Sequence, residues 1–238
     1  LMLSIIVPVR NESDNLKDVF DYFTKNVKDL RYEVLIINDF SKDETFKVAK
    51  DLEQKYDNFK ILDNKKKGLG GAINLGIEKA EGDYIAIMMA DRSDDINDLK
   101  NYLQIISSEN LDAVLGSRFL KKSKVKNYPI RKLVLNRIFN LFVSLIFWNK
   151  YNDYTNAFKI YKTDALKTMS PFVSESFNIF LEIPLKIISR NYSYELTSIN
   201  WFGRKKGAAK FKIKELRSKY LFTLIYCFIE KILLKIKK

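Results

Sequence analysis

The stretch DYIAIMMADRSDD (residues 83–95) joins an unbroken apolar run to a cluster of carboxylates. Residues 83–89 lack the polar alternation of a half-buried strand, so they predict a strand covered on both faces. Asp91 ends that strand directly. Sheets of parallel strands bind ligands at the carboxyl ends of the strands, so these acids indicate a ligand site. The alternative is that Ser93, Asp94 or Asp95 caps the helix that follows.

Outward from this stretch, apolar runs alternate with segments of helical period. The runs predict strands, and the periodic segments predict helices. This alternation is typical of a doubly wound, mostly parallel α/β sheet of the Rossmann-like kind. Polar or glycine-rich residues follow the expected strands at 10–12, 38–39 and 65–71. The expected strands are 3–9, 32–38, 59–62, 83–89 and 111–116, and the expected helices are 13–28, 43–56, 69–81 and 96–107.

The composition narrows the chemistry. The 238 residues include one cysteine, Cys227, and no histidine. An internal disulfide, a cysteine-ligated zinc site and a Ser-His-Asp triad are therefore excluded. Any metal must bind to oxygen ligands, which favours Mg²⁺ or Mn²⁺.

The formal net charge of +13 indicates an anionic partner, unless it reflects only a lysine-rich composition. Basic residues concentrate in 118–132 and 203–217, whereas the first hundred residues hold most of the acids. These basic stretches lack the interleaved aromatic side chains on which nucleic-acid bases stack. We therefore expect a phosphorylated ligand and an anionic membrane surface as partners, and no nucleic acid.

Two apolar segments follow the α/β half of the chain. Residues 133–148 would form a helix about 24 Å long, which is shorter than the bilayer core of about 30 Å. Its polar residues Asn136, Asn140 and Ser144 form one narrow stripe. The segment from Tyr220 onward is apolar and ends in lysines. Both predict helices in the membrane interface, on the cytoplasmic face, with a core helix as the alternative for 133–148.

The motifs resemble those of the inverting family-two glycosyltransferases with the GT-A fold. The resemblance rests on SIIVPVRNESDNL, LIINDFSKDET, GLGGAINLGIEKAEGDYI, MMADRSDD and VLGSRF, in this order. NDYTNAFKIY, FNIFLEI and RKKGAAK are similar to later motifs of the polyprenyl-phosphate sugar transferases, such as dolichyl-phosphate mannose and glucose synthases. The resemblance covers about residues 3–215. It implies a glycosyltransferase domain over 1–215 with an inserted interface helix at 130–149, and a basic amphipathic helix at 216–238.

The resemblance also implies the donor site. Asp39 matches an aspartate that contacts the base, and Asp91 matches the last aspartate of the D-x-D metal motif. Ser93 is the candidate second ligand for Mg²⁺ or Mn²⁺, with Asp94 and Asp95 as the alternatives that could substitute for a missing carboxylate. Glycines before the helix at 69–81 suit the approach of backbone N–H groups to an anion, although such a turn is commonly only a turn. The expected nucleotide-binding residues are Pro8, Arg10, Asn11, Glu12, Asp39, Gly68, Gly70, Ala90 and Asp91.

On the acceptor side, the resemblance implies that arginines and lysines hold phosphates and that two acids face the acceptor. These candidate catalytic residues, with Asp91, are Arg118, Arg131, Asp153, Glu182, Arg204 and Lys210. The chain also departs from the family pattern. Met89 replaces the first aspartate of D-x-D, which should weaken metal binding. Asn38, Phe40, Leu135 and Ala209 stand at other altered positions.

The expected reaction is transfer of a sugar from a nucleoside diphosphate, of the GDP-mannose or UDP-glucose type, to a polyprenyl phosphate, with inversion and metal dependence. A lipid phosphate is already anionic at neutral pH, so this acceptor needs cations and no base. Two alternatives remain open at this point. One is transfer to a saccharide or glycolipid hydroxyl with Asp153 or Glu182 as base. The other is a non-catalytic descendant that binds a nucleotide sugar.

Overall fold

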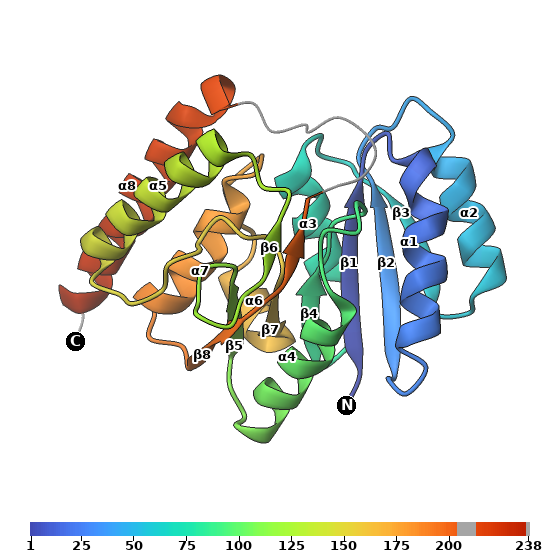
Figure 1. The fold of residues 1–238 in the computed structure, drawn as a ribbon, viewed down its shortest axis with the longest axis horizontal. Coiled ribbons are helices and arrows are strands. Elements are labelled where there is room, and N and C mark those ends of the chain that lie inside the picture. Colours follow the sequence, from blue (N-terminus) through green and yellow to red (C-terminus); the bar gives the residue numbers. More distant parts are fainter. Residues whose placement is uncertain (204–212, 237–238) are drawn as a thin grey trace.

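A computed structural model describes residues 1–203 and 213–236. In the described part of the chain, seven strands form one sheet in the order β3-β2-β1-β4-β7-β5-β8 (Figure 1). Six of them run parallel, and β7 lies antiparallel between β4 and β5. The mostly parallel α/β sheet is thus confirmed. Its strands are β1 (Leu3–Val9), β2 (Tyr32–Asn38), β3 (Phe59–Asp63), β4 (Tyr84–Ile87), β5 (Ala113–Ser117), β7 (Lys159–Lys162) and β8 (Tyr194–Ser198).

Helices cover both faces of this sheet (Figure 1). The four helices expected in the first half form within two residues of their predicted starts and ends. The helices are α1 (Ser13–Asn26), α2 (Thr45–Lys55), α3 (Leu69–Lys79), α4 (Ile96–Ser108), α5 (Ile130–Phe147), α6 (Thr163–Met169), α7 (Ile179–Ser189) and α8 (Ile213–Ile236). The strand expected over 83–89 is shorter, at 84–87, and a two-stranded sheet of β6 (Val125–Lys126) and β9 (Trp201–Phe202) lies apart.

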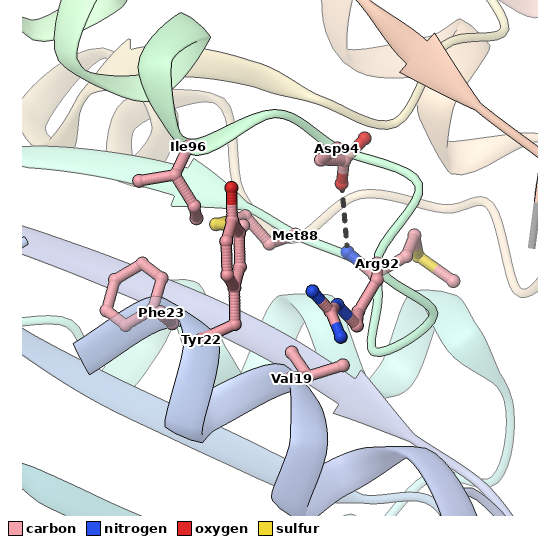
Figure 2. A pocket seen from close by; sticks show the side chains of 8 residues that line it. Val19, Tyr22, Phe23, Met88, Arg92, Asp94 and Ile96 are labelled. Carbon is pink, nitrogen blue, oxygen red and sulfur yellow. Dashed lines mark hydrogen bonds between the residues drawn. The ribbon is translucent and has the colours of Figure 1, made fainter. Parts of the chain in front are cut away.

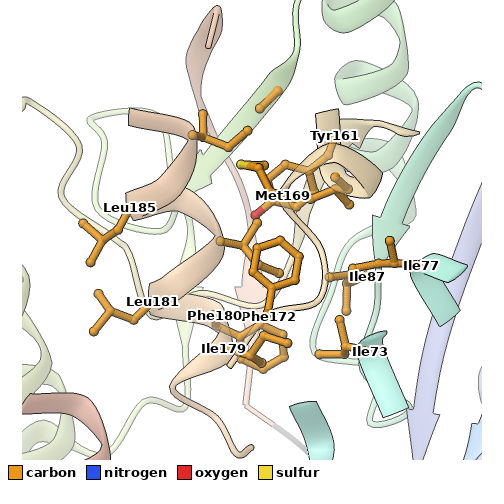
Figure 3. Packing of buried hydrophobic residues seen from close by; sticks show 14 of the residues in the cluster. Ile73, Ile77, Ile87, Tyr161, Met169, Phe172, Ile179, Phe180, Leu181 and Leu185 are labelled. Carbon is orange, nitrogen blue, oxygen red and sulfur yellow. The ribbon is translucent and has the colours of Figure 1, made fainter. Parts of the chain in front are cut away.

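Successive residues of β1 and β2 enter two different cores, which explains why their sequences are apolar throughout. Ile6 and Leu35 pack with α3, α6 and α7, whereas Ile5 and Val34 pack with α1, α2 and α4. Figure 3 shows the first core, in which Ile73 and Ile77 of α3 lie opposite Phe172 and α7. Each large apolar side chain fully buried there stabilises the fold by about 1.5–3 kcal/mol.

Helices α5 and α8 lie side by side along one edge of the molecule (Figure 1). Phe139 and Tyr220 hold them together with ring centroids 5.6 Å apart, and Phe147 and Phe228 do so at 6.0 Å. Helix α8 begins at Ile213, slightly before the expected segment 216–238. Among the described helices, none combines the length and apolar character needed to cross a bilayer.

The polar stripe of α5 faces inward. Asn140 is buried and its side chain accepts a hydrogen bond from the backbone N–H of Tyr154, while Ser144 donates to the carbonyl of Tyr151. Most of the apolar side of the helix is turned outward, whereas Val143 and Phe147 pack into the first core. Its exposed apolar residues are Ile130, Val134, Leu135, Ile138, Leu141, Phe142 and Leu145, followed by Trp148 just beyond the helix.

Candidate functional site at the carboxyl ends of the strands

The polar segments expected to form a site do meet at one edge of the sheet. Val9, Asn38 and Asp63 end β1, β2 and β3 in matching register, and Met88 continues β4 by donating its N–H to the carbonyl of Ile6. The segments that follow these four strands therefore lie together at the carboxyl edge. This is the position at which parallel α/β sheets bind ligands.

Asp39 is a firmly held acid of this edge. Its carboxylate is buried and accepts hydrogen bonds from the Asn64 side chain and the Gly68 N–H, both at 2.8 Å. The Arg10 guanidinium lies 3.9 Å from the other oxygen and remains largely exposed. These hydrogen bonds hold the Asp39 carboxylate in one orientation. Asn64 was missed in the sequence, although it follows a strand end as the other site residues do.

Asn11 and Glu12 tie the β1–α1 loop to the β2–α2 loop. Asn11 accepts a hydrogen bond from the Lys42 N–H, and the Glu12 N–H donates to Thr45. Pro8 is buried inside β1 beside Ile37. Asn11 and Glu12 thus join the two loops, whereas the Arg10 side chain lies beside Asp39.

The backbone at Phe40 explains the glycine that the family pattern has there. Phe40 has a φ of 54°, in the left-handed region that glycine adopts without steric cost. The chain keeps this turn with a bulky residue whose side chain is about half exposed. Asn38, the other altered position of this motif, donates to Asp63 at 2.8 Å.

The structure gives Gly68 and Gly70 a different role from the expected anion contact. The Gly68 N–H donates to Asp39, and the Gly70 N–H donates to the carbonyl of Glu175 at 3.1 Å. A Cβ on Gly70 would lie 1.7 Å from the carbonyl oxygen of Ser174. The glycines are therefore required because the 174–175 backbone packs directly on the start of α3. Their N–H groups are used within the protein.

The acids of the loop after β4 differ in their hydrogen-bond partners. Asp95 caps α4 by accepting from the Asn97 N–H at 3.0 Å, which confirms one of the capping alternatives. Asp91 accepts from the N–H of Ser93 at 3.0 Å. Ala90 and Ser93 are buried, so the Ser93 hydroxyl is less accessible than expected of a metal ligand.

Asp94 accepts a hydrogen bond from the Met89 N–H at 3.3 Å (Figure 2). Burial of this carboxyl group, together with the charge of Asp91, raises its pKa to about 8. Behind it lies a cavity of about 20 Å³ lined by Met88, Arg92 and Tyr22 among others, enough space for about one water molecule. No cluster of three acidic, histidine or cysteine side chains that could hold a metal occurs in the described residues.

Arg118 and Asp153 form a buried ion pair. The guanidinium donates to both carboxylate oxygens, at 2.8 and 2.6 Å, and the Arg118 N–H donates at 2.9 Å. The side chains are 8% and 0% exposed. Although burial opposes the charge, Asp153 raises the pKa of Arg118 above its usual value. The rings of Phe119, Tyr128 and Trp201 surround the guanidinium at 5.3–5.8 Å.

Glu182 is also fully buried and fully engaged. Its carboxylate accepts from the N–H groups of Val173 and Ser174 and lies 3.0 Å from the Lys186 ammonium. Glu182 thus holds the segment that packs on Gly68 and Gly70. Neither Asp153 nor Glu182 has a carboxylate oxygen free of a strong donor.

The remaining basic candidates are Arg131, Arg204 and Lys210. Arg131 is exposed in the first turn of α5. Arg204 and Lys210 lie outside the described residues. Trp201 was not expected to contribute, yet β9 lies against the acidic loop, since the Phe202 N–H donates to the carbonyl of Ser93.

Comparisons with known proteins agree with this geometry. The model of the glycosyl transferase family 2 matches residues 4–170. A dolichol-phosphate mannosyltransferase from Pyrococcus furiosus is 33% identical over 135 residues, which cover 56% of this chain and 38% of that protein. A dolichyl-phosphate beta-glucosyltransferase from Dictyostelium discoideum is 28% identical over 217 residues, covering 84% of this chain and 66% of the relative. The chain thus spans less than two thirds of either protein.

Solved structures share the fold at low sequence identity. Glucosyl-3-phosphoglycerate synthase from Mycobacterium tuberculosis, in complex with Mn²⁺, uridine diphosphate and glucosyl-3-phosphoglycerate, superposes with a TM-score of 0.71 and 15% identity. The match covers 95% of this chain and 79% of that one. The expected GT-A fold is confirmed, and with the family model matching more than half of its length, the chain belongs to glycosyl transferase family 2.

Proposed function

We propose that this chain transfers a sugar from a nucleoside-diphosphate sugar to a polyprenyl phosphate at a membrane surface. The observation that carries the proposal is that Arg10, Asp39 and Asp91 follow parallel strands at the carboxyl edge of the sheet, where the buried Arg118 follows β5. The names of the two relatives, which specify dolichyl-phosphate acceptors, support the choice of acceptor.

In the donor site, Asp39 would recognise the base and Arg10 would contact the diphosphate side of the nucleotide. Asp91 would hold Mg²⁺ or Mn²⁺, with Asp94 or Ser93 nearby and the diphosphate completing the ligand set. This all-oxygen donor set suits either ion. When bound, the ion supplies positive charge that stabilises the leaving diphosphate. The Mn²⁺ and uridine diphosphate in the solved structure with the same fold support this placement.

The transfer itself needs no general base. An oxygen of the lipid phosphate forms a bond to the anomeric carbon on the face opposite the leaving diphosphate. The bond from that carbon to the diphosphate oxygen breaks, and the diphosphate leaves with the electron pair. A hydroxyl acceptor would have to lose a proton. Asp153 and Glu182, the acids proposed as bases for that alternative, are buried in ion pairs with Arg118 and Lys186, which favours the phosphate acceptor.

The membrane contact would be the outward side of α5 and α8. Trp148 is 90% exposed and Ile130 77%, and α8 adds Leu221, Phe222 and Ile225 at 50% or more. Apolar surface gathered on two neighbouring helices is typical of an interaction site rather than of a free surface. The basic residues nearby, including Arg131 and Lys235, favour anionic lipids, which are abundant in the cytoplasmic leaflet.

A lipid extraction assay tests the enzymatic proposal. Purified full-length chain receives a polyprenyl phosphate, Mg²⁺ or Mn²⁺, and labelled GDP- and UDP-sugars, and label entering the organic phase is counted. We expect label from one donor only, abolished by EDTA and by Asp91→Ala. The matched control is Asp57→Asn, which changes an exposed acid distant from the site. Nucleotide-sugar binding without transfer to any lipid phosphate would contradict the acceptor and point to the non-catalytic alternative.

Flotation with vesicles tests the membrane contact separately. Vesicles with anionic lipid should carry the wild-type chain to the top of a gradient, and neutral vesicles should carry less of it. Replacing Leu221 and Phe222 by serine should release most of the protein, because each side chain contributes about 1.5–3 kcal/mol when buried. The control pair Lys47→Ser and Lys50→Ser, on the opposite helix α2, should float normally. Equal flotation of the two double variants would refute the proposal that α8 contacts the membrane through this surface.

A further inference from the structure

Lys159, a charged residue with no part in the reaction above, is completely buried at the start of β7. Its neighbour in the sheet is Ile87, the last residue of β4 before the acidic loop. Within the described residues no ion pair joins its ammonium to a carboxylate. Burial of an ammonium group costs free energy unless hydrogen bonds or opposite charges compensate for the lost water.

The partners of the Lys159 ammonium are backbone carbonyls of one short segment. It donates to the carbonyl of Tyr154 at 3.2 Å and to that of Asn156, and it lies 5.8 Å from the centre of the Tyr151 ring. These contacts fold residues 153–156 into a closed turn. Asp153, the first residue of that turn, holds the Arg118 guanidinium.

Other buried bonds fix the same turn to the end of β5. Tyr151 donates its hydroxyl to the carbonyl of Gly116 at 2.8 Å, and the Asn156 side chain donates to that carbonyl at 3.3 Å. Gly116 lies two residues before Arg118. The turn and the strand end that carry the ion pair are thus joined on both sides, and Lys159 supplies the charged bond at the centre.

Charged groups of both signs act on Lys159. Arg118 is a buried cation and Asp153 is a buried carboxylate. Burial lowers the pKa of Lys159 to about 7, Asp153 raises it and Arg118 lowers it further. Asp94 also raises the pKa of Lys159. An anionic phosphate near Arg118 would likewise favour the charged ammonium.

We propose that Lys159 is a positioning residue whose buried ammonium holds the 153–156 turn, and with it the Asp153–Arg118 pair, in the arrangement that receives an anionic phosphate. The phosphate part of this inference rests on the proposed function. Because coupling between two sites is reciprocal, bound phosphate favours the charged ammonium, and the charged ammonium strengthens phosphate binding.

The test uses full-length wild type, Lys159→Arg and Lys159→Met, with Lys162→Met as a control on the same strand. The probe is farnesyl phosphate, whose affinity is measured by calorimetry between pH 7 and 9. If bound phosphate raises the pKa of Lys159 by about one unit, binding to wild type becomes about fivefold weaker between pH 7 and pH 9. Lys159→Arg should bind well throughout, Lys159→Met weakly throughout, and Lys162→Met like wild type. Equal affinity and pH dependence in wild type and both Lys159 variants would overturn the proposal.

A second measurement needs no ligand, so it tests the positioning role of Lys159 independently of the identity of the acceptor. The Nε–H signal of Arg118 in ¹⁵N NMR, assigned with Arg118→Lys, should shift in wild type with a midpoint near pH 7 and stay constant in Lys159→Arg. If wild type binds no farnesyl phosphate, the proposed acceptor is wrong and this signal still decides the positioning role. An identical pH shift in Lys159→Arg would overturn that role even where Lys159→Met fails to fold.

Discussion

Removal of the charge from Asp153 should destabilise the fold strongly. The carboxylate is 0% exposed and receives three donors from Arg118, two from the guanidinium and one from the backbone. Asp153→Asn keeps the size of the side chain but leaves the guanidinium buried without a counter-charge. The rings of Phe119, Tyr128 and Trp201 lie 5.3–5.8 Å from the guanidinium, and only 8% of the Arg118 side chain is exposed.

The magnitude follows from the burial of both partners. Breaking a buried ion pair by neutralising one partner costs about 3–5 kcal/mol. The asparagine carbonyl still accepts one hydrogen bond, so we expect about 3 kcal/mol. With a urea m-value of about 2–3 kcal/mol per molar, the unfolding midpoint should fall by about 1–1.5 M.

Urea unfolding followed by circular dichroism measures this shift, with Asp29→Asn as the matched control. Asp29 pairs with Lys100 on the surface, where an ion pair contributes little, so its midpoint should not change measurably. The double variant Arg118→Met/Asp153→Leu should be more stable than Asp153→Asn, because no charge is left unpaired. A midpoint for Asp153→Asn equal to that of the control would refute the reasoning.

Three further predictions concern residues near the carboxyl edge of the sheet. Gly70→Ala should lower the melting temperature and weaken nucleotide binding in calorimetry, because its Cβ would lie 1.7 Å from the Ser174 carbonyl oxygen. An unchanged melting temperature and affinity would show that the 174–175 segment moves freely. The pKa of Asp94 is about 8 in the folded state and about 3.9 in the unfolded state, so folding binds a proton between these values. The stability of wild type should therefore fall relative to that of Asp94→Asn as the pH rises from 5 to 8. Parallel stability curves for these two proteins would contradict that pKa. Glu182→Gln should cost about 3 kcal/mol in urea unfolding, because it leaves Lys186 buried without its counter-charge, and a loss below 1 kcal/mol would contradict this.

Local pattern predicted the first half of the fold well. Residues 3–9 and 32–38 are strands over their whole expected length, and α3 begins at Leu69 as expected. The glycines before α3 were located correctly, but their role was not. Whether an N–H group meets a phosphate or the backbone of Glu175 depends on a segment more than one hundred residues away.

The sequence by itself determined the class of sheet and the edge at which Asp39 and Asp91 gather, because a fully buried strand must be apolar throughout and its polar residues must follow its end. Only the tertiary structure decided that β7 runs antiparallel between β4 and β5, that α5 turns its apolar side outward, and that Arg118 is neutralised by Asp153. These features depend on contacts between segments distant in sequence, and local periodicity contains no information about which distant partner a buried charge or a helix face will meet.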